Sequence, residues 1–145
     1  MWCKLMSRRM TDVFTKRKRS EVMSRIKGRD TSPELAVRSL LHRLGYRFRL
    51  HSRNLVGKPD IVLPRWRTVV FVHGCFWHRH RNCRFAYTPK TRKTFWLEKF
   101  AANVARDKAV ARQLVKLGWR VITVWECKVA NSRTLTRVLT KAISR

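Results

Sequence analysis

Hydrophobic and polar positions in the first half of the chain predict one helix followed by three strands. The segment 32–44 begins with Ser-Pro-Glu, carries leucines at helical spacing and is followed by a glycine, so we expect a helix there. Apolar and basic residues alternate over 46–51, which is typical of a half-exposed strand at a sheet edge. Short runs rich in β-branched residues at 61–63 and 68–72 predict two central strands.

The second half of the chain predicts a long helix, a fourth strand and a closing helix. Apolar residues keep a helical period over 93–117, and a glycine follows. The segment 119–125 has the composition of a buried strand, and apolar positions within 135–143 outline an amphipathic helix. The order α-β-β-β-α-β-α predicts an α/β fold in which helices flank a mixed central sheet.

The chain is expected to consist of an N-terminal arm and one domain. Residues 1–31 are basic and lack periodicity, so we expect a partly mobile arm there and a single domain at 32–145. Met10 could be the natural start, with 1–9 an upstream extension. No apolar run approaches the roughly 20 residues of a membrane span, and the first residues lack the apolar region of a secretory signal. We therefore expect a cytoplasmic protein.

The charge balance predicts the kind of partner. The chain has 35 lysines and arginines against eight aspartates and glutamates, a formal net charge of +27 at pH 7. Such a field attracts polyanions, so we expect nucleic acid as the partner. It does not indicate any chemistry, because attraction to phosphates is independent of sequence and of reaction.

Among the eight carboxylates, Asp60 stands apart as a ligand for a hard divalent cation. It opens the apolar run 61–63, where an acid is costly unless a cation meets it. The alternative is a strand-start residue bonded to nearby backbone. Glu34 can support such a site, or can serve the helix dipole and pair with Arg38 four residues on. Ordinary surface ion pairs are the expected role of Asp12, Glu21, Asp30, Glu98 and Asp107.

A cysteine and histidine motif predicts a zinc site. Cys75, His80 and Cys83 form C-x4-H-x2-C in one expected loop, and Cys127 follows a distant strand. Three thiolates and one imidazole make a closed tetrahedral zinc site, which would fix an irregular loop to the sheet. The alternative is three buried free cysteines, and we expect Cys3, on the arm, to take no part.

A catalytic ion has to bind apart from that zinc, because closed coordination leaves no place for substrate. We expect it at Asp60. His73 and His78 remain on the same loop, and a neutral imidazole near a metal-bound water is the usual general base. The alternative for either histidine is a hydrogen-bonded residue of the core or of the zinc surroundings.

Aromatic residues lie beside the basic loop, at Phe76, Trp77, Phe95 and Trp96. In a DNA-binding protein such rings can act as wedges between base pairs, and a mismatch is easier to open than a matched pair. The alternative is a small hydrophobic core around the zinc, which we favour for Phe95.

Four blocks of sequence, in the same order, resemble those of a known family. The blocks are Gly57-Lys58-Pro59-Asp60, Phe71-Val72-His73-Gly74-Cys75-Phe76-Trp77-His78, Phe95-Trp96-Leu97-Glu98-Lys99, and Gly118-Trp119-Arg120-Val121 with Trp125-Glu126-Cys127. The family is that of the very-short-patch DNA mismatch repair endonucleases, and the resemblance runs from about Met10 to the end. It implies a restriction-endonuclease-like fold and a strand-specific nick beside the thymine of a T:G mismatch left by deamination of 5-methylcytosine. It also implies catalytic magnesium and a functional link to a cytosine-5 DNA methyltransferase and other repair proteins.

The resemblance also implies residue roles. Asp60 would ligate magnesium, and His78 would be the catalytic histidine, assisted by His73 and supported by Glu34. Val72 falls on a second metal-binding position, where only its backbone carbonyl can take part. No Glu-x-Lys pattern follows the metal-binding aspartate, and the histidines would replace that lysine. The implied intercalators are Phe76, Trp77 and Trp96, and the implied zinc ligands are Cys75, His80, Cys83 and Cys127.

Two other functions stay open at this point. One is a zinc-stabilised basic nucleic-acid-binding protein without catalysis, and the other is a nuclease of the same fold that acts on another DNA structure. In each case we expect a monomer.

Overall fold

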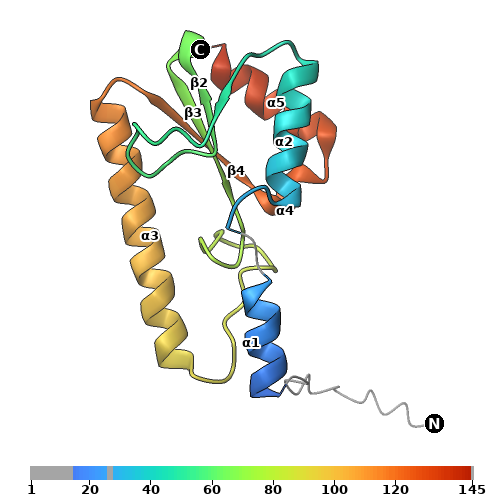
Figure 1. Ribbon diagram of the computed structural model, residues 1–145, viewed down its shortest axis with the longest axis vertical. Coiled ribbons are helices and arrows are strands. Elements are labelled where there is room, and N and C mark those ends of the chain that lie inside the picture. The colour runs from blue at the N-terminus through green and yellow to red at the C-terminus, as the bar shows by residue number, and fades with distance from the viewer. Residues whose placement is uncertain (1–14, 26–27, 145) are drawn as a thin grey trace, which may run out of the picture.

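The computed structural model describes residues 15–25 and 28–144, in which helices pack on one sheet and one further helix, the first in the chain, lies apart from that sheet (Figure 1). The elements are α1 (Lys16–Ser24), α2 (Ser32–Arg43), β1 (Arg49–Leu50), β2 (Ile61–Leu63), the 3₁₀ turn η1 (Pro64–Trp66), β3 (Thr68–His73), α3 (Lys93–Lys116), β4 (Arg120–Trp125), α4 (Glu126–Val129) and α5 (Ser132–Ile143). No helix within these described ranges is long and apolar enough to span a bilayer.

The strands form one mixed four-stranded sheet in the order β1-β2-β3-β4, and this confirms the predicted sheet type. The pairs β1–β2 and β2–β3 are antiparallel, whereas β3 and β4 are parallel. A parallel pair needs a crossover connection, and α3 provides it. In the centre of the sheet Val70 lies opposite Ile61 on one side and Ile122 on the other.

Helices cover both faces of this sheet, with α2 and α5 on one face and α3 on the other (Figure 1). Successive strand residues point to opposite faces. Ile61 and Val70 therefore join the larger core under α2 and α5, while Val62 and Val69 pack with Leu114 of α3. Both expected central strands are thus buried on two faces, as their apolar composition predicted.

The start of α2 and the ends of α2 and α3 lie where the local sequence favours them. Pro33 lies in the first turn of α2, where its missing N–H removes no helical hydrogen bond. Gly45 after α2 and Gly118 after α3 adopt positive φ values of 83° and 78°. The Arg67 guanidinium donates to the carbonyl oxygens of Leu117, at 2.8 Å, and Gly118, at 3.3 Å, and so satisfies the C-terminal end of α3.

The predicted strand at 46–51 is reduced in the structure to Arg49–Leu50, whose side chains are exposed. Tyr46 and Phe48 pack against the larger core from irregular backbone, and the Tyr46 ring meets the Trp66 ring edge-on at 5.0 Å. The alternation of apolar and basic residues therefore reflects rings that fill the core from a loop. The prediction that this segment supplies an edge strand was correct, because β1 lies at one edge of the sheet.

The described part of the N-terminal arm is helical, which the sequence analysis did not predict. Helix α1 begins after Thr15, whose side-chain oxygen accepts a hydrogen bond from the Lys18 N–H at 3.3 Å. Its described side chains are exposed, so the helix depends on local propensity and capping rather than on packing. Residues 1–14 and 26–27 lie outside the described residues, and the division into arm and domain stays a prediction.

The end of the chain differs in two details from the prediction. Strand β4 is an edge strand rather than a fully buried one, because it pairs only with β3 within the described sheet, and its Thr123 side chain is exposed. The short helix α4 follows it directly and was not predicted. This helix carries Cys127 back toward the loop after β3.

Candidate active site and metal centre

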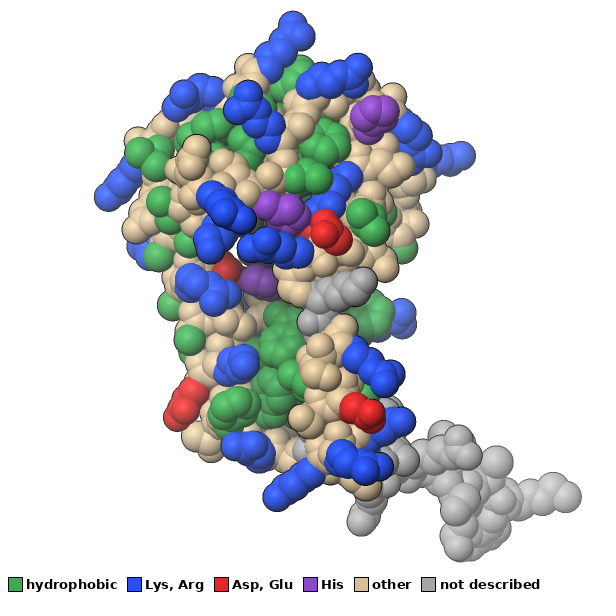
Figure 2. Space-filling model, in the orientation of Figure 1, with side chains coloured by type: hydrophobic (Ala, Val, Ile, Leu, Met, Phe, Trp, Pro, Cys, Tyr) green, Lys and Arg blue, Asp and Glu red, His purple; other side chains and the backbone are tan. Residues whose placement is uncertain are grey.

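A pocket of about 980 Å³ opens where the start of α2, the residues before β2, the end of β3, strand β4, the loop after β3 and the middle of α3 meet. Acidic residues and histidines line it together with many basic side chains, and Figure 2 shows histidines among lysines and arginines on this face. Such a mixture suits a DNA phosphate bound with a divalent cation. The basic lining residues are Arg29, Arg53, Lys58, Arg79, Arg81, Arg106 and Lys108.

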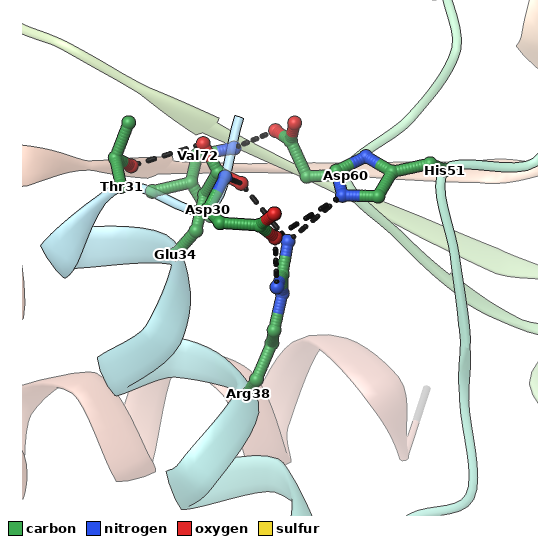
Figure 3. Close-up of polar contacts among 7 residues, drawn as sticks. All are labelled: Asp30, Thr31, Glu34, Arg38, His51, Asp60 and Val72. Atoms are coloured by element: carbon green, nitrogen blue, oxygen red, sulfur yellow. Dashed lines mark hydrogen bonds and ion pairs between the residues drawn. The ribbon is translucent and has the colours of Figure 1, made fainter. Parts of the chain in front are cut away.

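Asp60 lies in this pocket, directly before β2, and is partly buried. Its Oδ2 accepts a hydrogen bond from the N–H of Val72 on β3, with 2.7 Å between nitrogen and oxygen (Figure 3). Burial raises the pKa of Asp60; the Val72 hydrogen bond opposes this shift, and the charge of Glu34 adds to it. The second carboxylate oxygen makes no hydrogen bond to any described residue, so it is available to a cation.

The carbonyl of Val72 is oriented to the same place. The N–H and C=O of a strand residue point to the same side of the strand, so this carbonyl points toward β2. Extending the β2–β3 register by two residues puts Val72 opposite Pro59, which has no N–H to donate. Asp60 and Val72 therefore offer a carboxylate and a carbonyl oxygen, which are donors that fit a magnesium ion completed by water and phosphate oxygens.

Glu34, in the first turn of α2, is buried and fully hydrogen-bonded (Figure 3). Its Oε2 lies 3.0 Å from Nη2 of Arg38, and this confirms the ion pair predicted from their four-residue spacing. The same oxygen accepts from the backbone N–H of Asp30 at 3.0 Å, and Oε1 accepts from the hydroxyl of Thr31 at 2.9 Å. These bonds hold Glu34 close enough to Asp60 to affect its pKa.

Arg38 connects the site to two residues that the sequence analysis had not assigned to it. Its Nη1 lies 2.6 Å from Oδ1 of Asp30, and its Nη2 lies 3.1 Å from Nε2 of His51. The bond to Arg38 holds the pKa of Asp30 below its usual value. Asp30 was expected in an ordinary surface ion pair, but its partner is a buried arginine. Helical spacing could have indicated that Arg38 is buried, because Glu34, Arg38 and Leu41 share the buried face of α2. A buried arginine needs acidic partners such as Asp30.

His73 and His78 lie together in the pocket, as the sequence analysis expected, and a carboxylate from α3 joins them. The two imidazole rings stack with centroids 3.9 Å apart and an angle of 10° between their planes. Nδ1 of His78 lies 2.6 Å from Oδ2 of Asp107. Burial lowers the pKa of His73 to about 4, so this ring is neutral near pH 7.

Asp107 is therefore a site residue that the sequence analysis missed. We expected it in a surface ion pair, yet its side chain is only 22% exposed and binds His78. The signal that could have found it is helical spacing, because Phe100, Asp107 and Leu114 are seven residues apart on the face of α3 that is buried. An acid on such a face needs a partner.

The predicted zinc ligands converge. One donor atom from each of Cys75, His80, Cys83 and Cys127 lies within 4.8 Å of the others. Nδ1 of His80 is 3.3 Å from the sulfur of Cys127 and 3.7 Å from that of Cys75. Burial raises the pKa of the Cys75 thiol to about 12, so deprotonating it requires a compensating cation. The donor set and its spacing fit a tetrahedral zinc ion.

The aromatic residues form one cluster between this loop and the start of α3. The Phe76 ring lies 5.0 Å from that of Trp77, 5.6 Å from that of Trp96 and 5.1 Å from that of Phe100. We had favoured Phe95 as a core residue, and this prediction was wrong, because its side chain is 44% exposed. Phe76, Trp77 and Trp96 are half-buried, so the cluster is partly accessible. Figure 2 shows an apolar area on the face that also carries the basic side chains.

A carboxylate at the start of a strand, a histidine bonded to a second carboxylate and a pocket lined by basic residues are features expected at the site of a DNA-cleaving enzyme. Comparison with known families specifies the class. The family described as DNA mismatch endonuclease Vsr matches residues 11–84. The chain belongs to this family, and its mixed sheet flanked by helices is consistent with a Vsr nuclease fold.

Similarity to individual proteins extends over most of the chain. The type II nicking enzyme V.XorIIP of Xanthomonas oryzae pv. oryzae is 49% identical over 122 residues, which cover 84% of this chain and 89% of that protein. The type II nicking enzyme V.NmeAIP of Neisseria meningitidis is 48% identical and covers 84% of this chain and 86% of its own length. The DNA mismatch endonuclease Vsr of Escherichia coli is 46% identical over 127 residues, 88% of this chain and 81% of its own.

Proposed function

We propose that this endonuclease nicks one strand of double-stranded DNA beside the thymine of a T:G mismatch that arises when 5-methylcytosine deaminates. The observation that carries the proposal is the convergence of Asp60 and the His78–Asp107 pair on one cation-lined pocket. Basic residues around the pocket would hold the backbone, while an acid and a base are available for hydrolysis.

His78 is the general base in this proposal. Its Nδ1 is 2.6 Å from a carboxylate oxygen of Asp107, which accepts the Nδ1 proton and fixes the tautomer. Nε2 then has a free lone pair that can take a proton from the attacking water. His73 stacks on the His78 ring and holds its orientation, and Glu34 supports the site through its place beside Asp60.

The proposal assigns two different metals. Asp60 and the Val72 carbonyl would hold magnesium, which when bound polarises the phosphate and stabilises the charge that develops on it. Zinc would bind at the cluster of three cysteines and one histidine. Because that donor set is complete without substrate, the role of zinc is structural. The zinc ligands would be Cys75, His80, Cys83 and Cys127.

Asp107→Asn is expected to lower the single-turnover rate of T:G nicking by about 10²–10⁴-fold. The amide is nearly the same size, but it neither stabilises a protonated His78 nor enforces the Nδ1–H tautomer. Glu98→Gln is the matched control, since Glu98 is an exposed acid on the same helix and should leave the rate unchanged. An Asp107→Asn rate equal to that of the wild type would contradict the role of His78.

Phe76, Trp77 and Trp96 are the proposed wedge that opens the mismatch. Trp77→Ala should weaken binding to a T:G duplex by about 5- to 150-fold, because stacking is worth roughly 1–3 kcal/mol per base. Binding to a matched T:A duplex, which is harder to open, should change less. Titration of fluorescent duplexes measures both affinities, with Phe95→Ala as a comparison from the same cluster. Equal losses for both duplexes would argue against a wedge.

The family supports a role in DNA repair, and the net charge of +27 supports binding to DNA. We propose a monomer that acts on chromosomal DNA in the cytoplasm, with a functional link to a cytosine-5 DNA methyltransferase and to other repair proteins. A nuclease that acts on another DNA structure is the second candidate, because the relatives include proteins named only as type II nicking enzymes.

A panel of duplexes separates these candidates. Labelled T:G, T:A and C:G duplexes in several sequence contexts are incubated with the protein and magnesium, and nicks are resolved on a denaturing gel. The proposal predicts nicking of T:G duplexes alone. Efficient nicking of a matched duplex or of another mismatch would favour the second candidate.

A further inference from the structure

Asp30, Glu34 and His51 surround the guanidinium of Arg38 beside Asp60 (Figure 3). Their donor atoms lie within 4.8 Å of one another, which is the spacing of a metal site. Arg38, however, already contacts all three, with separations of 2.6 Å to Asp30, 3.0 Å to Glu34 and 3.1 Å to His51. A metal ion would have to displace a guanidinium whose residue is 9% exposed. The cluster is therefore filled by an arginine and acts to orient its neighbours.

Arg38 fixes the tautomer of His51. A guanidinium carries only hydrogen-bond donors, so Nε2 of His51, 3.1 Å from Nη2, must accept. Oδ1 of Asp30 also lies 3.5 Å from Nε2, but this contact is the longer one, and the same oxygen already accepts from Nη1 of Arg38 at 2.6 Å. A proton on Nε2 would point at the N–H of Arg38 and remove the acceptor of that hydrogen bond. The neutral ring therefore carries its proton on Nδ1.

The Nδ1 atom of His51 is available to a ligand. Nδ1 lies on the other edge of the imidazole from the nitrogen that faces Arg38 (Figure 3). Among the described residues it has no hydrogen-bond partner, and the one buried side-chain nitrogen there without a partner is Nε of Arg38. Nδ1 is thus open to solvent, and His51 lines the same pocket as Asp60 and Lys58.

The backbone at His51 points to the same conclusion. His51 has a φ of +46°, in the left-handed region that side chains other than glycine seldom adopt. Such conformations persist where the surroundings fix them, and they gather at ligand sites. Here the Arg38 contact and the loop between β1 and β2 hold the imidazole at the pocket wall.

We propose that His51 is a further substrate contact, whose Nδ1–H donates to a non-bridging oxygen of the DNA phosphate that binds beside Asp60, and that Arg38 is its positioning residue. This assignment rests on the proposed function, because it takes a DNA phosphate as the ligand of the pocket. It adds a neutral donor next to the basic residues of the pocket, and a neutral donor recognises an oxygen at a defined place rather than charge alone.

A double-mutant cycle tests the contact. The T:G duplex carries either a normal phosphate or one stereoisomer of a methylphosphonate at the nicked position, and binding is measured without added magnesium. His51→Ala should weaken binding to the normal duplex by about 10- to 100-fold, the worth of a hydrogen bond to a charged group. With the stereoisomer that removes the contacted oxygen, His51→Ala should cause no further loss. His42→Ala, an exposed histidine on α2, is the matched control and should change neither affinity.

A second substitution keeps the test valid if alanine disturbs the loop. Asparagine tolerates positive φ and places an amide N–H₂ near the position of Nδ1, so His51→Asn should bind within about threefold of the wild type. Equal losses for His51→Ala and His51→Asn, or additive effects of substitution and methylphosphonate, would overturn the contact. If the wild type nicks the T:G duplex with magnesium but the effects of His51→Ala and the methylphosphonate add, only the His51 contact is overturned. A wild type that nicks no duplex overturns the proposed function and this assignment with it.

The positioning role of Arg38 has a spectroscopic signature. Long-range ¹H–¹⁵N spectra of the folded protein at neutral pH should show His51 protonated on Nδ1 and unprotonated on Nε2. Arg38→Met, which removes the donors, should shift His51 toward the other tautomer. A wild-type His51 protonated on Nε2 would overturn the role of Arg38.

Discussion

Asp60→Asn is expected to lower magnesium-dependent nicking of a T:G duplex by on the order of 10³-fold or more, the largest effect of any single substitution in the site. The amide is isosteric and its oxygen can still accept from the Val72 N–H, 2.7 Å from Oδ2 in the native protein. The substitution therefore removes the charge that we propose binds the cation, and it leaves the strand pairing intact. Single-turnover rates with saturating protein measure the chemical step directly.

Two comparisons make this result specific. Glu98→Gln removes one charge from an exposed position and should retain the wild-type rate. Asp60→Asn should still bind the T:G duplex, because the basic residues and aromatic cluster remain. A variant that nicks within tenfold of the wild type would show that the cation is held elsewhere.

Cys127→Ser is expected to release zinc and to lower the melting temperature by about 10 °C or more. Cys127 on α4 brings a distant strand end to the loop of Cys75 and His80, and its sulfur lies 3.3 Å from Nδ1 of His80. Losing this ligand frees the loop after β3, which also carries His78. Nicking should therefore fall together with stability.

Cys3→Ser is the control, because Cys3 stands apart from the motif in the sequence. Metal analysis after mild dialysis should find one zinc per chain in the wild type and in Cys3→Ser, and much less in Cys127→Ser. A wild type without zinc, or a Cys127→Ser protein that keeps its zinc and its melting temperature, would contradict the metal centre.

The fold was predictable where one local pattern determined one element. The β-branched runs became β2 and β3, and the helical period with a terminal glycine became α3. The prediction was wrong where an apolar residue had another way to be buried. Tyr46 and Phe48 reach the core from a loop, so their alternation did not indicate a continuous strand. Helix α1 was missed because it has no apolar face to reveal it.

The site residues also divide into those that the local sequence predicts and those that it does not. Asp60 and the zinc motif are marked by unusual chemistry in their immediate sequence, and the structure brings each of them to a site. Asp107 and His51 are ordinary residues in sequence, and they gain a role only through partners 29 and 13 residues away. Such partners depend on how α2 and α3 pack on the sheet, which local patterns do not specify.

We propose above all that this pocket cuts one strand of a T:G duplex beside the thymine. The most direct measurement uses a T:G duplex with a different label on each strand, resolved at single-nucleotide resolution with and without magnesium. The account predicts one nick, next to the mismatched thymine, in the thymine strand only and only with magnesium. Cuts in both strands, or equal cutting of a matched T:A duplex, would contradict it.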